Sequence, residues 1–170
     1  MSNLFASITL PLLFFGFFDM DWQTVDDKIS QDFQNVEFIS TDELYSLYVK
    51  ESVALPLIID VRTDNEFQVS HLPKALNLET AKEILQLFSD KNTNIVVYCS
   101  VGYRSAAIAE ELIKLDYKSV RNLHHSIFEW ASKDYPLLNE NGDTDKAHPF
   151  NKRWGKLLDD SLHEYSFGKP

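Results

Sequence analysis

The sequence alternates between short runs of β-branched apolar residues and longer stretches in which apolar residues recur at helical spacing. Leu57–Val61 and Ile95–Tyr98 have the length and composition of buried strands. Between and after these runs, apolar residues at i, i+3, i+4 and i+7 predict amphipathic helices at 81–88 and 108–115. Strands that alternate with helices form a parallel sheet covered on both faces. The pattern therefore predicts an α/β domain, which we place at residues 36–138.

Shorter sequence patterns predict the remaining helices and strand of this domain. Ser40–Glu43 has the form of a capping box and predicts a helix over 41–51. Ser119–Leu123 predicts a weaker strand, and a last short helix begins near Ile127. We expect the parallel sheet to include all the predicted strands.

Two extensions flank the predicted domain. Residues 1–35 contain an apolar stretch, Leu4 to Phe18, and then the acidic residues 19–35, which show no periodicity and which we interpret as a linker. Residues 139–170 form a C-terminal extension that begins as a polar loop and continues as a predicted amphipathic helix. The apolar residues of this helix are Trp154, Leu157, Leu158, Leu162 and Tyr165. The helix either docks on the domain or binds a partner.

Leu4–Phe18 allows two interpretations. It has the length of a signal-peptide hydrophobic region and is shorter than the roughly 20 residues of a membrane-spanning helix. No Lys or Arg precedes it, and no small-residue cleavage site follows it. The segment is either a membrane-associated or export segment, or an arm that packs on the core or covers a groove. A cytoplasmic and a membrane-associated or exported location therefore both remain open.

Charge and cysteine content exclude several classes of function. The formal net charge of −10 repels phosphate backbones, so we expect no nucleic-acid binding as the main function. A single cysteine excludes an internal disulfide, a CxxC redox pair and a cysteine-rich zinc site. Phosphate-binding and dinucleotide-binding glycine motifs are missing, so we expect no cofactor. We also expect no metal, since the adjacent His124 and His125 should point apart.

The single cysteine, Cys99, stands between a predicted buried strand and a predicted helix. Gly102 allows a backbone turn with positive φ, so that several N–H groups can face inward and bind an anion. The positive end of the following helix points to the same place. Together with Arg104 it is expected to lower the thiol pKa by about two units. The loop Cys99–Ser105 therefore predicts a reactive thiolate.

Three segments resemble the rhodanese-like sulfurtransferase family. Ile58–Arg62, with Glu66-Phe67 and His71-Leu72-Pro73, resembles the first signature of this family. Ile95–Ser105 resembles the active-site loop, and Leu123–Trp130 with Pro136 resembles the closing helix. The resemblance covers residues 36–138 and implies a five-stranded parallel sheet flanked by helices on both faces.

The resemblance also implies the chemistry. Cys99 takes the outer sulfur of a small donor such as thiosulfate, becomes a persulfide, and passes the sulfur to a thiol or to cyanide. The implied substrate-binding loop consists of Ser100, Val101, Gly102, Tyr103, Arg104 and Ser105. Asp60 and Arg62 are expected to support the loop, together with Glu66, as a structural set of ion pairs.

Loop length and composition separate the alternatives. The loop from Cys99 to Arg104 has the length that resembles sulfurtransferases, whereas related arsenate reductases and phosphatases use one residue more. Ser100 stands where the family often has a basic residue, which weakens the case for an anionic donor. A sulfur carrier or binding module with weak turnover is the main alternative, and an oxyanion enzyme is the other.

Overall fold

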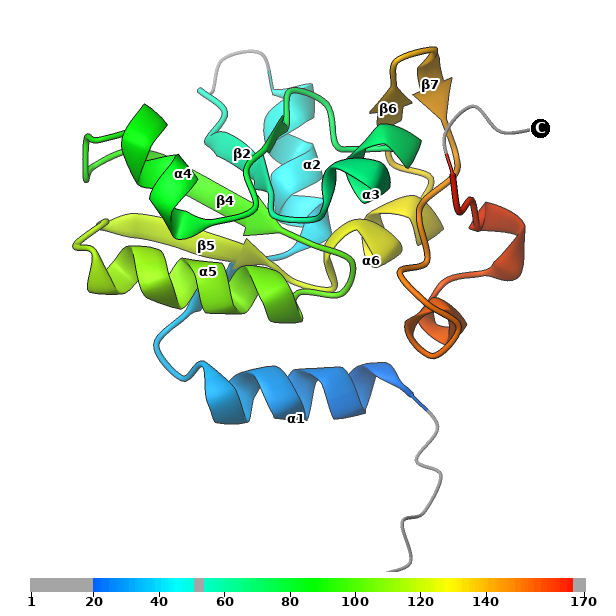
Figure 1. Ribbon diagram of the computed structural model, residues 1–170, viewed down its shortest axis with the longest axis horizontal. Coiled ribbons are helices and arrows are strands. Elements are labelled where there is room, and N and C mark those ends of the chain that lie inside the picture. Colours follow the sequence, from blue (N-terminus) through cyan, green and yellow to red (C-terminus); the bar gives the residue numbers. More distant parts are fainter. Residues whose placement is uncertain (1–19, 51–53, 167–170) are drawn as a thin grey trace, which may run out of the picture.

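A five-stranded parallel sheet forms the centre of the molecule in the computed structural model, which describes residues 20–50 and 54–166 (Figure 1). The strand order is β1-β5-β4-β2-β3, and every neighbouring pair is parallel. The strands are β1 (Glu37–Ile39), β2 (Leu57–Asp60), β3 (Leu76–Asn77), β4 (Asn94–Tyr98) and β5 (Ser119–Leu123). The predicted α/β fold with five parallel strands is confirmed.

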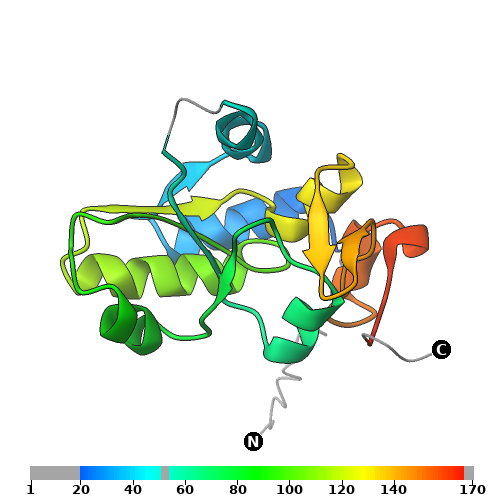
Figure 2. The ribbon, with the colours of Figure 1, turned by 90° about the horizontal axis from the view of Figure 1, so that it is seen from above.

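Helices cover both faces of this sheet. They are α1 (Trp22–Asp32), α2 (Thr41–Val49), α3 (Asp64–Val69), α4 (Ala81–Leu87), α5 (Tyr103–Lys114) and α6 (Ser126–Ser132). Figure 2 shows α2 on one side of the sheet and α4 and α5 on the other. The central strand β4 contributes side chains to the apolar layers on both faces of the sheet. Val96 and Tyr98 pack with α2 and α6, whereas Ile95 and Val97 pack with α4 and α5.

Burial on both faces explains why β4 is a continuous apolar run rather than an alternating one. All four residues from Ile95 to Tyr98 are fully buried. The next residue, Cys99, continues the alternation and belongs to the same apolar layer as Ile95 and Val97. The strand therefore places Cys99 at the carboxyl edge of the sheet, with its side chain on the same face as Ile95 and Val97.

Capping boxes begin three of the helices. Ser40 and Glu43 exchange hydrogen bonds at the start of α2, as the sequence predicted. Thr80 and Glu83 do the same at the start of α4. At the start of α3, the Glu66 carboxylate accepts from the Thr63 backbone N–H at 3.1 Å, and this carboxylate also reaches the site described below. These boxes satisfy amides that a helix N-terminus would otherwise leave without partners.

The prediction of a linker over 19–35 is wrong. Helix α1 occupies Trp22–Asp32, begins with a side-chain cap from Asp21, and buries Val25 and Ile29 against the core. Two apolar side chains spaced by four residues are too few to stand out as a periodic pattern. The helix is stabilised by tertiary packing more than by its own propensity.

The prediction of one amphipathic helix in the C-terminal extension is also wrong. The structure has a hairpin, β6 (Leu137–Asn139) with β7 (Gly142–Thr144), and two short 3-10 helices, η1 (Trp154–Leu157) and η2 (Asp160–Leu162). A Cβ atom on Gly155 would lie 3.1 Å from His163 Cε1, so this segment folds closely back on itself. Four of the five predicted apolar side chains still face the core: Leu158 is buried, and Trp154, Leu157 and Leu162 pack against it. The fifth, Tyr165, is exposed.

The apolar stretch Leu4–Phe18 lies outside the described residues, so its membrane association stays a prediction. Among residues 20–50 and 54–166, no helix combines the length and the apolar character needed to cross a membrane.

Candidate active site

Cys99 lies at the carboxyl end of β4, and the first turn of α6 holds its backbone. The Cys99 N–H donates to Ser126 Oγ at 3.2 Å, and the Cys99 carbonyl accepts from the Ile127 N–H at 3.2 Å. The Ser100 carbonyl accepts from the Phe128 N–H at 3.1 Å. The loop therefore rests on backbone donors of a helix far along the chain, and the Cys99 side chain is only 1% exposed.

Gly102 directs a backbone donor at the sulfur. Its φ of 104° lies in the left-handed region that glycine adopts without steric cost. In this conformation its N–H donates to Cys99 Sγ at 3.2 Å, and its carbonyl accepts from Asn122 Nδ2 at 2.8 Å. A Cβ atom would meet Ile29 Cδ1 at 3.5 Å, an ordinary contact. The requirement for glycine is therefore conformational.

The pKa of the Cys99 thiol lies below its ordinary value. Burial raises this pKa, but the positive charge of Arg104 and hydrogen bonding from Ser105 and Gly102 together outweigh that effect. The Ser105 hydroxyl is buried and makes no hydrogen bond to another nitrogen or oxygen of the described residues. It is free to donate to a sulfur anion. The arrangement therefore gives Cys99 a larger thiolate fraction than an ordinary cysteine has at the same pH.

Arg104 is shared between the sulfur and a buried carboxylate. Its Nη1 donates to Glu66 Oε2 at 2.9 Å, and its Nη2 donates to Glu66 Oε1 at 2.7 Å and to Ser100 Oγ at 3.0 Å. The Glu66 side chain is 4% exposed. Burial alone would raise the pKa of Glu66, but Arg104 and Arg62 lower it to about 2. The Arg104 guanidinium is thus held beside the loop in a bidentate ion pair with Glu66.

Asp60 and Arg62 form a second, separate pair beneath the loop. Arg62 Nη2 donates to Asp60 Oδ2 at 2.6 Å and to the Ser70 carbonyl at 2.6 Å, and both side chains are fully buried. Asp60 stands opposite Tyr98 in the sheet, directly before the cysteine. The three residues expected to form ion pairs all do so, but in two separate pairs, because the Glu66 carboxylate is bound to Arg104. The supporting role of Asp60 and Arg62 stays a prediction.

The C-terminal extension covers the cysteine. Phe150 and Trp154 complete a cavity of about 170 Å³ whose other lining residues belong to the loop, from Cys99 to Arg104. The Phe150 ring lies 4.7 Å from the Arg104 guanidinium, in cation–π contact. Phe150 has a φ of 62°, which is an outlier for a bulky residue. Sequence reasoning missed this cover: Trp154 was part of the apolar stripe, but nothing in the sequence near Phe150 indicated where it would lie.

Helix α1 packs on the other side of the loop. The Tyr103 hydroxyl donates to Asp32 Oδ2 at 2.6 Å, and the Phe33 and Tyr103 rings meet edge to face at 5.2 Å. Ile29 lies against Gly102. The loop is therefore held between α1, α6 and the C-terminal extension, which Figure 1 places near one another at the carboxyl ends of the strands.

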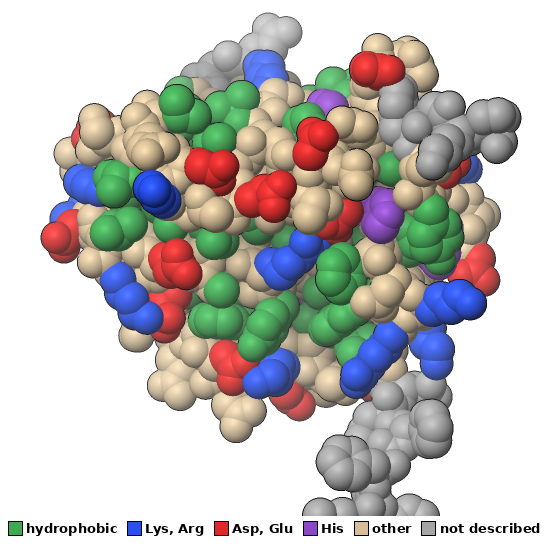
Figure 3. Space-filling view, in the orientation of Figure 1, with side chains coloured by type: hydrophobic (Ala, Val, Ile, Leu, Met, Phe, Trp, Pro, Cys, Tyr) green, Lys and Arg blue, Asp and Glu red, His purple; other side chains and the backbone are tan. Residues whose placement is uncertain are grey.

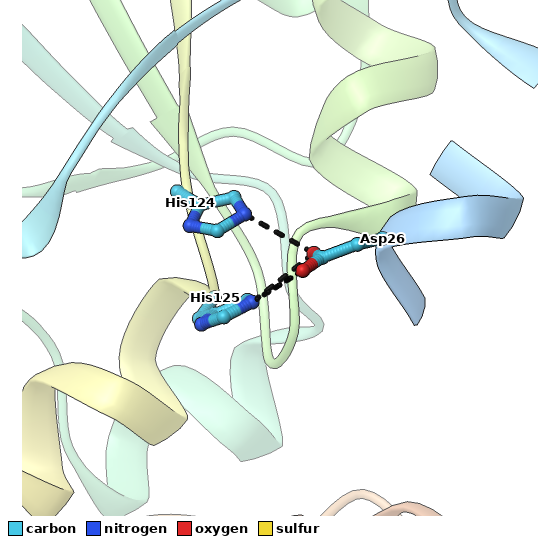
Figure 4. A group of neighbouring side chains, drawn as sticks. All are labelled: Asp26, His124 and His125. Carbon is cyan, nitrogen blue, oxygen red and sulfur yellow. Dashed lines mark hydrogen bonds and ion pairs between the residues drawn. The ribbon is translucent and has the colours of Figure 1, made fainter. Parts of the chain in front are cut away.

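The prediction that His124 and His125 point apart is wrong. Figure 4 shows both rings directed at Asp26 of α1. The two rings stack with centroids 3.8 Å apart. His125 and Ser126 have φ values of 54° and 51°, and these consecutive left-handed residues turn the second ring back onto the first. The ligand atoms of Asp26, His124 and His125 lie within 4.8 Å of one another, so this group could hold a metal.

Known proteins resemble this chain in both sequence and fold. The family model for the rhodanese-like domain matches residues 40–133. A putative mitochondrial thiosulfate sulfurtransferase of Schizosaccharomyces pombe is 29% identical over 115 residues, which are 59% of this chain and 81% of the relative. The thiosulfate sulfurtransferase GlpE of Coxiella burnetii is 33% identical over 97 residues, which are 55% of this chain and 86% of the relative.

A solved structure shows the same fold. The rhodanese-related protein of Thermoplasma volcanium superposes with a TM-score of 0.51 at 23% identity, over 61% of this chain and 99% of that protein. The family match spans more than half of the chain and includes Glu66, Cys99 and Arg104. The chain belongs to the rhodanese-like domain family.

Proposed function

We propose that this protein is a sulfurtransferase that moves a sulfane sulfur from a small donor, such as thiosulfate, to a thiol or cyanide acceptor through a Cys99 persulfide. The observation that carries the proposal is the lowered pKa of a buried cysteine that receives the Gly102 N–H at 3.2 Å. The two relatives named thiosulfate sulfurtransferases support the same reaction class.

The reaction consists of two displacements at sulfur. In the first, the Cys99 thiolate attacks the outer sulfur of the donor, a new S–S bond forms, and the donor's S–S bond breaks. With thiosulfate, sulfite leaves with the electron pair. In the second, the acceptor attacks the outer sulfur of the persulfide, and the thiolate is regenerated. The Gly102 N–H and the Ser105 hydroxyl stabilise the sulfur anion at each stage, so the reaction needs no separate base.

The remaining loop residues have distinct tasks in this proposal. Ser100 holds the Arg104 guanidinium through its hydroxyl. Val101 and Tyr103 line the cavity beside the sulfur. Both terminal nitrogens of Arg104 donate to Glu66. The charge of Arg104 therefore lowers the pKa of the thiol, but its donors are not available to bind a tetrahedral oxyanion. This geometry disfavours the arsenate reductase and phosphatase alternatives.

A sulfur carrier with slow turnover is the second candidate. The cover formed by Phe150 and Trp154 favours it, because a shielded persulfide exchanges its sulfur slowly with solvent nucleophiles. The two candidates share the first displacement and differ in the rate of the second.

The intact mass of the protein after incubation with donor tests the proposal. Wild type should gain one sulfur atom, and Cys99→Ser should gain none while keeping its fold, since the substitution changes little volume. Rapid release of the sulfur to cyanide, measured as thiocyanate, identifies an enzyme, whereas slow release identifies a carrier. Transfer by Cys99→Ser above a few per cent of wild type would refute the persulfide mechanism.

A further inference from the structure

The cavity over Cys99 is apolar, and the protein's own C-terminal extension forms one of its walls. Its lining residues outside the loop are both aromatic, Phe150 and Trp154, and the loop contributes Val101 and the Tyr103 ring. Figure 3 shows apolar side chains gathered on this face between the N-terminal end of α5, α1 and the C-terminal extension. A group that enters this cavity exchanges water for aromatic and aliphatic surface.

The charge available to a substrate in this cavity is small. Arg104 is the one cation among the described residues that line it, and Glu66 neutralises that cation through two hydrogen bonds. His148, two residues before Phe150, adds no charge, because burial lowers the pKa of its imidazole below the ordinary value. Thiosulfate carries two negative charges, and it would have to approach a thiolate here without a free positive partner. Burying unpaired charge is costly.

The cavity over Cys99 shares two lining residues with a larger cavity. Tyr103 and Trp154 also line a cavity of about 600 Å³ beside α1. Its other lining residues include the apolar Met20 and Val25 and the charged Asp27, Lys28 and Arg153. The organic group of a donor whose sulfur reaches Cys99 would contact the Tyr103 and Trp154 rings, which line both cavities.

We propose that Phe150 and Trp154 form a specificity pocket for organic sulfane-sulfur donors of low charge, such as aryl or alkyl thiosulfonates and organic persulfides, in preference to inorganic thiosulfate. This inference rests on the proposed sulfur transfer and names the donor class for it. With a thiosulfonate, the Cys99 thiolate attacks the terminal sulfur, the S–S bond forms, and the bond between that sulfur and the sulfonyl group breaks. The sulfinate leaves with the electron pair, and the enzyme holds a persulfide anion.

The test compares benzenethiosulfonate with thiosulfate in the full chain, with cyanide as acceptor and kcat/KM as the measured quantity. Wild type should prefer benzenethiosulfonate by about tenfold or more, the discrimination that a single apolar group can provide in a hydrophobic pocket. Phe150→Ala and Trp154→Ala should each reduce this preference by a similar factor, mainly through a loss with the aromatic donor. Phe38→Ala is the matched control, since Phe38 is 40% exposed, close to the 42% of Phe150, and does not line this pocket.

The outcomes distinguish a failure of the proposed specificity pocket from a failure of the proposed sulfur transfer. A wild-type preference for thiosulfate, or equal losses with both donors in the two pocket variants, would overturn the pocket and leave sulfur transfer standing. If neither donor adds sulfur to Cys99, both proposals fail. Phe150→Leu serves as a second variant should an alanine variant unfold, and it should retain part of the preference.

A second inference concerns the group of Asp26, His124 and His125 (Figure 4). His124 Nε2 lies 3.1 Å from Asp26 Oδ1, and His125 Nε2 lies 3.0 Å from the same oxygen. The other ring nitrogen of His125, Nδ1, faces Glu129 Oε1 at 3.4 Å. Both nitrogens of one imidazole therefore face carboxylate oxygens, although a neutral imidazole has a single N–H to donate. A cation bound between His125 and Asp26 would leave the single N–H of a neutral His125 on Nδ1, facing Glu129.

A metal ion can occupy the position between His125 and Asp26. A metal-bound histidine commonly donates its other N–H to a carboxylate, as His125 Nδ1 can do to Glu129. Two imidazole nitrogens and one carboxylate oxygen are ligands that Zn²⁺ accepts, with water in the fourth position. A cavity of about 380 Å³, lined by Asp26 and His124, provides room for that water. We infer that Asp26, His124 and His125 bind a divalent transition-metal ion, with Zn²⁺ as the first choice.

Calorimetric titration with zinc chloride tests this site. The Cys99→Ser background is used throughout, because a free thiolate also binds zinc. We expect one Zn²⁺ per chain and an affinity at least tenfold lower in Asp26→Asn and in His124→Gln, since even loss of a second-shell partner costs about 10- to 100-fold. Asp27→Asn, the neighbouring position on α1, is the matched control and should bind as the parent does. Absence of binding, or equal binding in all variants, would refute the site.

Discussion

Replacing Arg104 by glutamine tests the electrostatic account of the Cys99 thiolate. Arg104 is the group whose positive charge lowers the pKa of the buried thiol, against the opposing effect of burial. Glutamine removes this charge but keeps an amide that can donate to Glu66, so the buried carboxylate retains a partner. The substitution therefore changes the field at the sulfur more than it changes the packing.

The magnitude follows from the geometry of the pair. An opposite charge within about 4–6 Å shifts a pKa by about 1–3 units. The Arg104 side chain is 33% exposed and shares its charge with Glu66, so the effect on the pKa of Cys99 should lie at the lower end of this range. The thiolate is the charged form, and loss of a cation disfavours it, so the pKa of Cys99 should rise. Below that pKa, the thiolate fraction should fall by about tenfold.

Nucleophilicity offsets part of this loss. A thiolate of higher pKa is intrinsically more reactive, with a Brønsted slope of about 0.4–0.5, which returns about threefold for a shift of one unit. Alkylation of Cys99 near neutral pH should therefore slow by about threefold in Arg104→Gln, and the plateau at high pH should rise by about threefold.

Iodoacetamide alkylation, followed by intact mass across the pH range in which thiols titrate, measures both quantities. The midpoint of the profile is decisive, because a change in access to the buried sulfur would alter the rate at every pH and leave the midpoint unchanged. Arg153→Gln is the control: Arg153 is exposed on the C-terminal extension and does not line the Cys99 cavity. An unchanged midpoint in Arg104→Gln would show that the hydrogen bonds from Gly102 and Ser105 set the pKa without Arg104.

Three further substitutions test the supports of the site. Asp60→Asn leaves Arg62 buried without its counter-charge and should cost about 3–5 kcal/mol of unfolding free energy, whereas the exposed Asp116→Asn should change it by less than about 0.5 kcal/mol. Equal effects in a urea titration would contradict this. Gly102→Ala should cost about 1–2 kcal/mol through its positive φ, and an unchanged melting temperature would argue against that strain. Glu66 has a pKa lowered from 4.5 to about 2, so it adds up to about 3 kcal/mol above pH 4.5 that is lost as pH falls toward 2. The stability difference between wild type and Glu66→Gln should shrink across this window, and a constant difference would exclude the linkage.

Elements that depend on local patterns were predictable. The apolar runs Leu57–Ile59 and Ile95–Tyr98 lie in strands, because a strand covered on both faces is apolar along most of its length. Helix α1 and the two 3-10 helices were not predictable in the same way. Helix α1 has few apolar residues and no clear period. The apolar residues from Trp154 to Leu162 do recur at helical spacing, yet they form two 3-10 helices in place of one α-helix. Packing against the core stabilises these segments.

The candidate site also contains residues that the local sequence predicts and residues that only tertiary packing brings in. Cys99, Gly102 and Arg104 lie within six consecutive residues, and a strand followed by a helix determines how this loop turns. The sequence by itself therefore determined the proposed nucleophile, the backbone donor and the nearby cation. It also determined the fold class, since alternating strand and helix periods leave few other topologies.

Only the tertiary structure decided which distant side chains complete the site. Glu66 comes to Arg104 from α3, and Phe150 comes to the same guanidinium from beyond the last strand of the sheet. Two left-handed residues bring His124 and His125 together opposite Asp26. Such contacts depend on how whole elements pack, and sequence periodicity reports the direction of a side chain relative to its own element alone. The residues that neutralise the cation and cover the sulfur were therefore set by packing over long sequence separations.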